Sequence, residues 1–127
     1  MQQNEKMFEE IYQAFLRTYR NQATRTDTAN YLSSVYAMYK PSTYMRYLDS
    51  FLHMMDGTQF ASVVPINLSV YLLQCIERDF GVSALQQALL AEKQHIQYYY
   101  DVCGSASKGL RTALQALASQ HDLQIDF

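Results

Sequence analysis

The sequence predicts an all-α protein, and three observations carry that prediction. Apolar side chains recur at steps of three and four residues along most of the chain, which is the spacing of one helix face. No stretch alternates convincingly between apolar and polar residues, as a half-buried strand would. Only four glycines and two prolines are present, and nearly all of them fall where a helix would begin or end. Five or six helices with short links predict an antiparallel helical bundle, with a four-helix core and one or two additional helices.

The predicted helices follow from these apolar rows and from the residues that interrupt them. The second helix begins at a cap formed by Asp27 or Thr28 and ends at Lys40, because Pro41 disfavours helical geometry in the residue before it. The six helices are expected over residues 4–19, 28–40, 44–56, 65–80, 83–103 and about 105–120.

Glycines and one proline mark the remaining helix ends. Gly57, Gly81 and Gly104 each follow a predicted helix, as a C-terminal glycine does. Pro65 suits the first turn of the fourth helix. Residues 83–86, with the sequence SALQ, resemble a capping box that opens the fifth.

Two apolar rows fix the expected inner faces. On the second helix the inward row is Tyr31, Leu32, Val35, Met38 and Tyr39. On the fifth helix it is Leu85, Ala88, Leu89, Ile96, Tyr99 and Cys103.

Length and composition indicate one domain over residues 1–127. Apolar residues make up 49% of the chain and charged residues 17%, enough for a real core. The net charge is −2 and the ten basic residues are scattered, so we expect no nucleic-acid partner, since phosphate binding needs a clustered basic surface. The longest uncharged run, residues 57–76, is broken by polar residues, and no secretory signal opens the chain. We therefore expect a cytoplasmic protein that does not span a membrane.

Eleven tyrosines and no tryptophan distinguish the composition. Six rings fall in apolar rows and are expected in the core, with their hydroxyls at its rim: Tyr12, Tyr19, Tyr31, Tyr39, Tyr44 and Tyr99. Four others fall on polar faces or borders and are expected to be exposed: Tyr36, Tyr47, Tyr98 and Tyr100. Exposed tyrosines are favoured at contact surfaces, including those of homodimers, although isolated exposed rings are also ordinary.

The sharpest enzyme-like pattern is Glu92 with His95. At positions i and i+3 the two side chains share one helix face, as in ferritin-like metal sites, but those sites need the pattern on two helices. It occurs once here, so we expect no metal and no cofactor. Glu92 is in line with inward residues and is expected either to be partly buried with a raised pKa or to lean towards water. No nucleophile motif or phosphate-binding loop is present, which predicts a protein that is not an enzyme. Cys75 and Cys103 are expected to be reduced thiols.

Three segments carry a family resemblance. The segments EEIYQAFLRTYRN, TANYLSSVYAMYKP and VVPINLSVYLLQCIERDF resemble, in order and spacing, the immunity proteins of pediocin-like (class IIa) bacteriocins. The resemblance covers about residues 5–103, and the chain departs from the family by a further amphipathic helix after Gly104. It implies a small cytosolic four-helix bundle that protects the producing cell by engaging a membrane sugar-transporter receptor once the bacteriocin has bound it.

The resemblance also implies where specificity lies. The family's specificity is attributed to its C-terminal half, which falls here on the fifth and sixth helices. The partner-binding residues expected there are Gln97, Tyr98, Tyr100, Lys108 and Arg111, beside Tyr36 and Tyr47 from the tyrosine pattern. Two other functions remain open: a dimeric regulatory or interaction module, and a metal-binding helical-bundle enzyme that uses Glu92 and His95.

Overall fold

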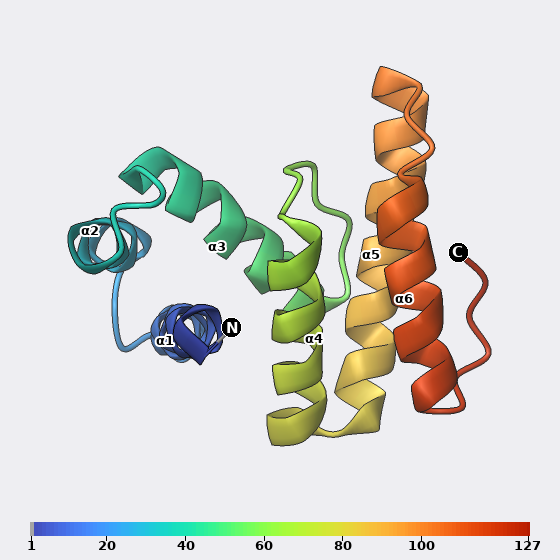
Figure 1. Cartoon of the computed structure of the whole chain (residues 1–127), viewed down its shortest axis with the longest axis horizontal. Helices are drawn as coiled ribbons and strands as arrows, with labels where there is room; N and C mark the ends of the chain where they lie inside the picture. The colour runs from blue at the N-terminus through green and yellow to red at the C-terminus, as the bar shows by residue number, and fades with distance from the viewer. Residues whose placement is uncertain (1) are drawn as a thin grey trace. The chain divides into compact units, whose positions relative to one another are not determined.

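The computed structural model describes residues 2–127, with side chains from residue 5 onward, and contains six α-helices and no strand among them (Figure 1). The all-α prediction is confirmed. The helices are α1 (Gln2–Tyr19), α2 (Arg25–Val35), α3 (Pro41–Asp56), α4 (Ile66–Phe80), α5 (Val82–Cys103) and α6 (Lys108–Gln120).

The chain divides into two compact units, one ending at Leu52 and the other running from His53 to Phe127. The first holds α1, α2 and most of α3, and the second holds α4, α5, α6 and the residues after them. In the first unit α1 packs antiparallel to α2, and in the second unit α5 packs antiparallel to both α4 and α6, so the predicted antiparallel packing is found in both. That residues 1–127 form a single domain stays a prediction.

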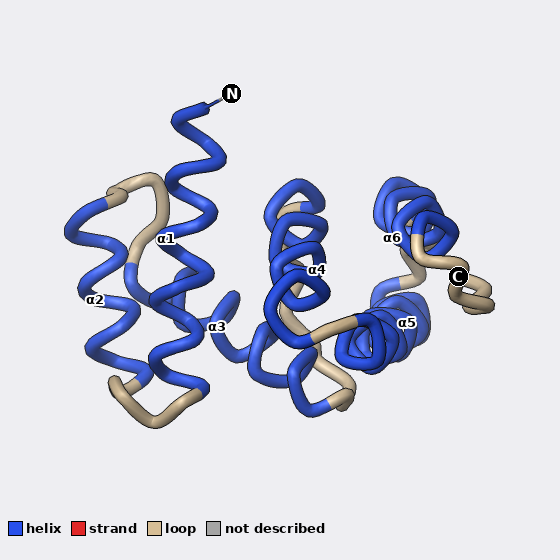
Figure 2. Tube along the Cα trace, turned by 90° about the horizontal axis from the view of Figure 1, so that it is seen from below, coloured by secondary structure: helices blue, strands red, loops and turns tan. Residues whose placement is uncertain are grey.

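In the first unit, α1 and α2 lie side by side and run in opposite directions (Figures 1 and 2). Phe51 of α3 contributes the central ring, with centroids 5.9 Å from Tyr12 in an edge-on arrangement and 5.7 Å from Phe15. A hydrogen bond of 2.7 Å between the hydroxyls of Thr18 and Thr28 joins α1 to α2. Aromatic contacts of this kind add about 0.5–1.5 kcal/mol each to the burial of apolar area.

The second helix is shorter than its sequence pattern predicts, and both predicted ends are wrong. Thr24, not Asp27 or Thr28, is the N-cap, and its hydroxyl accepts the backbone N–H of Asp27 at 3.1 Å. The helix ends at Val35, because Tyr36 leaves helical geometry and its carbonyl instead accepts the hydroxyl of Tyr44 at 2.7 Å. The helix thus ends beside a tertiary hydrogen bond, five residues before the predicted end at Lys40.

This early end changes which side chains of the second helix are buried. The predicted inward residues Tyr31, Val35 and Met38 are 48%, 50% and 63% exposed, so their predicted burial is wrong. Leu32 of the same row is buried as predicted, and Tyr39 is half-buried. Tyr19 of α1, also expected in the core, is 36% exposed. The buried residues of α2 are Thr28, Ala29 and Leu32.

Pro41 also has a different role from the one predicted. It is the first residue of α3, where a missing N–H costs nothing, and the predicted start at residue 44 is late by three residues. The carbonyl of Lys40 accepts the N–H groups of Thr43 and Tyr44 at 3.0 and 3.2 Å. At the other end of α3, Gly57 has a φ of 71°, as expected of a C-terminal glycine.

In the second unit, α4 and α5 form an antiparallel pair joined at Gly81, and α6 runs antiparallel to α5 (Figures 1 and 2). Leucines and isoleucines that are fully buried fill the space between α4 and the other two helices. The apolar core of this unit includes Leu68, Leu72, Leu73, Ile76, Leu85, Leu89 and Leu114.

Two helix starts in this unit differ from prediction. Gly81 precedes α5 without a side-chain cap, so the predicted capping box at residues 83–86 is wrong. The sixth helix begins at Lys108 rather than at Ser105, after Ser107 adopts a left-handed φ of 50°. Gly104 ends α5 in a left-handed conformation, as predicted.

Candidate partner-binding site

The buried side of α5 holds His95 against the loop before α4. His95 is 2% exposed, its ring stacks on that of Phe60 at 4.3 Å, and its Nδ1 lies 2.7 Å from the Phe60 carbonyl oxygen. A carbonyl oxygen only accepts, so Nδ1 carries a proton and donates it. Burial lowers the pKa of His95, which favours the neutral imidazole.

Glu92 lies one turn before His95 on the same side of α5. Its side chain is buried, with the residue 1% exposed, and its Oε2 has no hydrogen-bond partner among the described residues. Burial raises the pKa of Glu92 to about 8, so the acid is mostly protonated at neutral pH. Of the alternatives left open for Glu92, burial with a raised pKa is the one that the structure shows. Among the described side chains, no three His, Cys, Asp or Glu residues form a group that could hold a metal ion.

The opposite, open side of the α5–α6 pair contains two adjoining cavities of about 310 and 280 Å³. Both are lined by Ile96, Gln97 and Arg111. We call them together the Arg111 cleft. Its remaining lining residues are Tyr100 and Ala106 in the first cavity, and Lys93, Gln94 and Phe127 in the second.

The C-terminal residues supply one wall of this cleft. The side-chain amide of Gln115 on α6 donates to the carbonyl of Ile125 at 3.0 Å, and its oxygen accepts the N–H of Phe127 at 3.3 Å. Ile125 is 6% exposed, so this segment has a buried anchor. The two hydrogen bonds hold the chain against α6 and place Phe127 at the cleft.

The charges around the cleft are of one sign. Lys93 and Arg111 line it, and no aspartate or glutamate does, although the chain has 12 acidic residues. A third cavity of about 350 Å³ beside Arg111 also lacks an acidic lining residue. The Arg111 guanidinium forms no ion pair or hydrogen bond with the described part of the chain. The nearest carboxylate on α5 is engaged: Asp101 accepts the amide of Gln97 at 2.9 Å.

Three of the predicted partner-binding residues therefore meet at one cleft: Gln97, Tyr100 and Arg111. All three are exposed, Tyr100 at 54%. Lys108 is exposed on the first turn of α6, and Tyr98 is half-buried on α5; neither lines the cleft.

Tyr36 and Tyr47 belong to the other unit, where both are half-buried near the α2–α3 turn. The Tyr47 ring packs edge-on against Tyr39 at 5.3 Å, and burial raises the pKa of its hydroxyl. Tyr39 also contacts Tyr44, whose pKa burial raises to about 12. The expectation of exposed rings at Tyr36 and Tyr47 is met only in part.

Sequence reasoning missed five lining residues, and two of them had a signal. The five are Lys93, Gln94, Ile96, Ala106 and Phe127. Lys93 and Gln94 lie four and three residues before Gln97, which places them on the same helix face. Ile96 was assigned to the interior, and it is both mostly buried and part of the cleft floor. Phe127 could not have been found, because only the fold of the residues after α6 brings it there.

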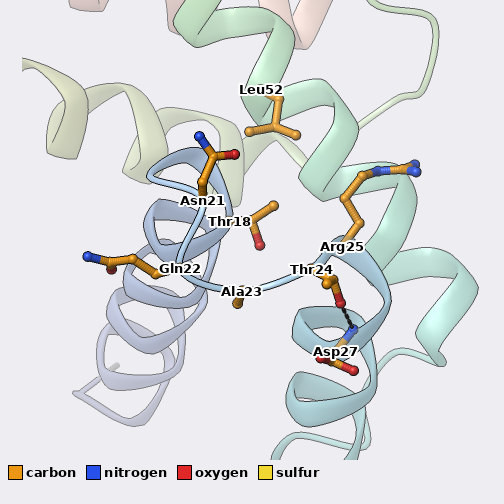
Figure 3. Close-up of a pocket in the computed structure, with 8 residues that line it drawn as sticks. All are labelled: Thr18, Asn21, Gln22, Ala23, Thr24, Arg25, Asp27 and Leu52. Atoms are coloured by element: carbon orange, nitrogen blue, oxygen red, sulfur yellow. Dashed lines mark hydrogen bonds between the residues drawn. The ribbon is translucent and has the colours of Figure 1, made fainter.

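A larger cavity, of about 630 Å³, lies in the first unit at the turn between α1 and α2. Figure 3 shows Asn21, Thr18 and Leu52 around it, with Gln22 and Asp27 directed away. Its arginine, Arg25, is already bound to Asp49 by two hydrogen bonds of 2.7 and 2.5 Å. The arginine of the larger cavity is therefore already engaged and is not free for a ligand.

Comparisons of the chain with family models, curated proteins and solved structures find no match. The resemblance to bacteriocin immunity proteins thus stays a hypothesis. No helix in the described part of the chain is long and apolar enough to cross a bilayer. Cys75 is buried and Cys103 is exposed, contrary to the inward position predicted for Cys103, and both are free thiols.

Proposed function

We propose that the protein binds another protein through the α5–α6 face and acts, in the cytoplasm, as an immunity protein against a pediocin-like bacteriocin. One observation carries the proposal. Of the five residues that the family resemblance assigns to specificity, Gln97, Tyr100 and Arg111 line the same cleft. An amide, a phenol ring and a guanidinium are side chains that protein interfaces use for recognition.

The distribution of burial supports binding over catalysis. Glu92 and His95 are the residues whose types and spacing suggest chemistry, yet they are 1% and 2% exposed. Neither lines any of the four cavities described above. A general acid or base must come within hydrogen-bond reach of its substrate. The open face instead presents neutral polar, aromatic and cationic groups.

The experiment is protection of a sensitive bacterial strain. Cells that express the protein, and cells with the empty vector, are challenged with a panel of class IIa bacteriocins, and the minimal inhibitory concentration is measured. We expect a higher inhibitory concentration for at least one bacteriocin. Equal sensitivity of both strains to the whole panel, with the protein detected by immunoblot, would contradict the proposal.

One observation favours a second function, a dimeric interaction module. Tyr31, Val35 and Met38, on α2 and the turn after it, expose large apolar surface in the first unit. Surfaces of this kind often mark protein contacts. Light scattering at several concentrations tests it: a stable dimer that Met38→Lys dissociates favours this function, and a monomer at all concentrations excludes it.

A further inference from the structure

We propose that the Arg111 cleft receives a glutamate or aspartate side chain from the protein partner. The inference deepens the proposed function and takes from it only that the partner is a protein. Three kinds of observation carry it: the charges of the cleft, its size and the groups on its walls.

The charged side chains that line the cleft favour an anionic ligand. Arg111 and Lys93 line the cleft and no aspartate or glutamate side chain does, in a chain whose net charge is −2. Two other arginines differ in this respect, since Arg25 binds Asp49 and Arg78 binds Asp79. A guanidinium presents its donors as a planar fork that matches a carboxylate. Arg111 has this fork available.

The volume of each cavity suits a single side chain better than a whole small molecule. Small-molecule sites measure about 300–1,000 Å³. The two cavities of the cleft, about 310 and 280 Å³, are each close to the lower limit, and both are open to one side. One carboxylate-bearing side chain from a docked segment suits either cavity.

The walls suit the rest of such a segment. Tyr100 lines one cavity of the cleft, Phe127 lines the other, and Ile96 supplies apolar surface to both. Aromatic and aliphatic surface takes up the methylene groups of an acidic side chain and the chain beside it, and Gln94 adds an amide for backbone groups. An extended nucleic-acid backbone would need more than two cations along its path.

The test is NMR titration of the isotopically labelled full chain with two capped peptides, acetyl-(Glu)6-amide and acetyl-(Gln)6-amide. We expect shifts for Gln97, Tyr100 and the Arg111 side-chain N–H with the glutamate peptide only. Arg111→Gln should weaken that binding by about tenfold, as loss of a charged hydrogen-bond pair does. Arg46→Gln removes the same charge from the exposed side of α3 and is the matched control, for which the dissociation constant should not change.

Four outcomes would overturn the inference: equal binding of the glutamine peptide, no shift at the cleft, unchanged affinity in Arg111→Gln, or equal loss in Arg46→Gln. Tighter binding of single-stranded oligo(dT) at the same residues would also overturn it, in favour of a phosphate backbone. Spectra of both variants show whether they remain folded, and Arg111→Lys, which keeps the charge but not the fork, gives an intermediate affinity if the inference is right.

The inference and the proposed function fail separately. Peptide binding at Arg111 without protection in cells would leave the cleft assigned and the immunity role refuted. Protection without peptide binding would leave the immunity role standing and refute the carboxylate site.

Discussion

Both sides of α5 carry polar or ionisable residues, but those on the inner side are buried and those on the outer side are exposed. On the inner side, Glu92 and His95 are buried, and burial favours the neutral form of both. On the outer side, Lys93 and Gln97 are exposed at the Arg111 cleft. Glu92 and Lys93 are adjacent in sequence, yet only the lysine can meet a partner. Accessibility, more than residue type, decides which side of this helix can act on another molecule.

Burial of the residues on the inner side of α5 also costs free energy of folding. A carboxyl group that is buried without a full set of partners is less stable there than in water, and its charged form is less stable still. The stacked ring and the hydrogen bond of His95 to Phe60 offset part of that cost. The residues on the outer side are exposed and carry no such cost of burial, so we expect them to be changed with little effect on stability. The predictions below follow from this difference.

The largest expected effect is the pH dependence of stability caused by Glu92. The pKa of Glu92 is about 8 in the folded state, above its ordinary value of 4.5, so the folded state keeps its proton where the unfolded state loses it. Its contribution is complete below pH 4.5 and is lost as the pH rises to 8, by at most about 1.4 kcal/mol for each unit between the two pKa values. Glu92→Gln should therefore gain stability relative to the wild type over this range in urea denaturation.

The control for that experiment is Glu5→Gln, which removes an exposed carboxylate. His95 acts with the opposite sign: its lowered pKa makes the unfolded state bind more protons, so its contribution rises with pH up to about 6.5. Both proteins contain His95, so its contribution cancels in the difference between their free energies of unfolding. A difference that stays constant between pH 4.5 and 8 would show that Glu92 is not buried as described.

The second prediction concerns the His95 ring. His95→Ala removes a stacked ring and leaves the Phe60 carbonyl without its donor, so we expect a loss of about 2–3 kcal/mol in the free energy of unfolding. His53→Ala, at an exposed histidine of α3, should cost less than 1 kcal/mol, or roughly the value of one exposed hydrogen bond. Equal losses in the two variants would remove the distinction between buried and exposed histidines.

The third prediction extends the comparison to tyrosine hydroxyls. Tyr44→Phe deletes the hydroxyl that donates to the Tyr36 carbonyl and ends α2, and should cost about 1 kcal/mol. Tyr100→Phe deletes a hydroxyl on the open side of α5 and should leave the stability unchanged. Thermal unfolding followed by circular dichroism measures both. A larger loss for Tyr100→Phe would contradict the assignment of its ring to a free surface.

The smallest expected effect is the difference in stability cost between replacing Arg25 and replacing Arg111. Arg25 and Asp49 are 51% and 39% exposed at their side chains, so Arg25→Gln should cost at most about 1 kcal/mol, and less in high salt. Arg111→Gln should cost nothing measurable, because that guanidinium has no partner in the described residues. Urea denaturation at two salt concentrations compares them, and a cost for Arg111→Gln above that for Arg25→Gln would mean that Arg111 is structural.

Much of the fold could be predicted from periodicity, and the failures have local causes. Six helices are where apolar rows and glycines place them, because both signals are carried by neighbouring residues. The end of α2 at Val35 depends on the Tyr44 hydroxyl, which comes from another helix. No periodicity encodes such a contact.

The candidate site was predictable to a similar degree. Gln97 and Arg111 were expected on the outer faces of the last two helices, and the raised pKa of Glu92 followed from its place in an apolar row. Phe127 reaches the cleft only because Gln115 holds the segment after α6. The position of Phe127 depends on contacts between residues distant in sequence, which a sequence pattern does not show.

The central claim is that the protein acts through the outer side of the α5–α6 pair and not through its buried Glu92. Survival of bacteriocin-sensitive cells that express wild type, Glu92→Gln or the double variant Tyr100→Ala with Arg111→Gln tests it most directly, with immunoblots to equalise protein levels. We predict that wild type and Glu92→Gln protect equally and that the double variant does not protect. Protection by the double variant together with its loss in Glu92→Gln would contradict the claim.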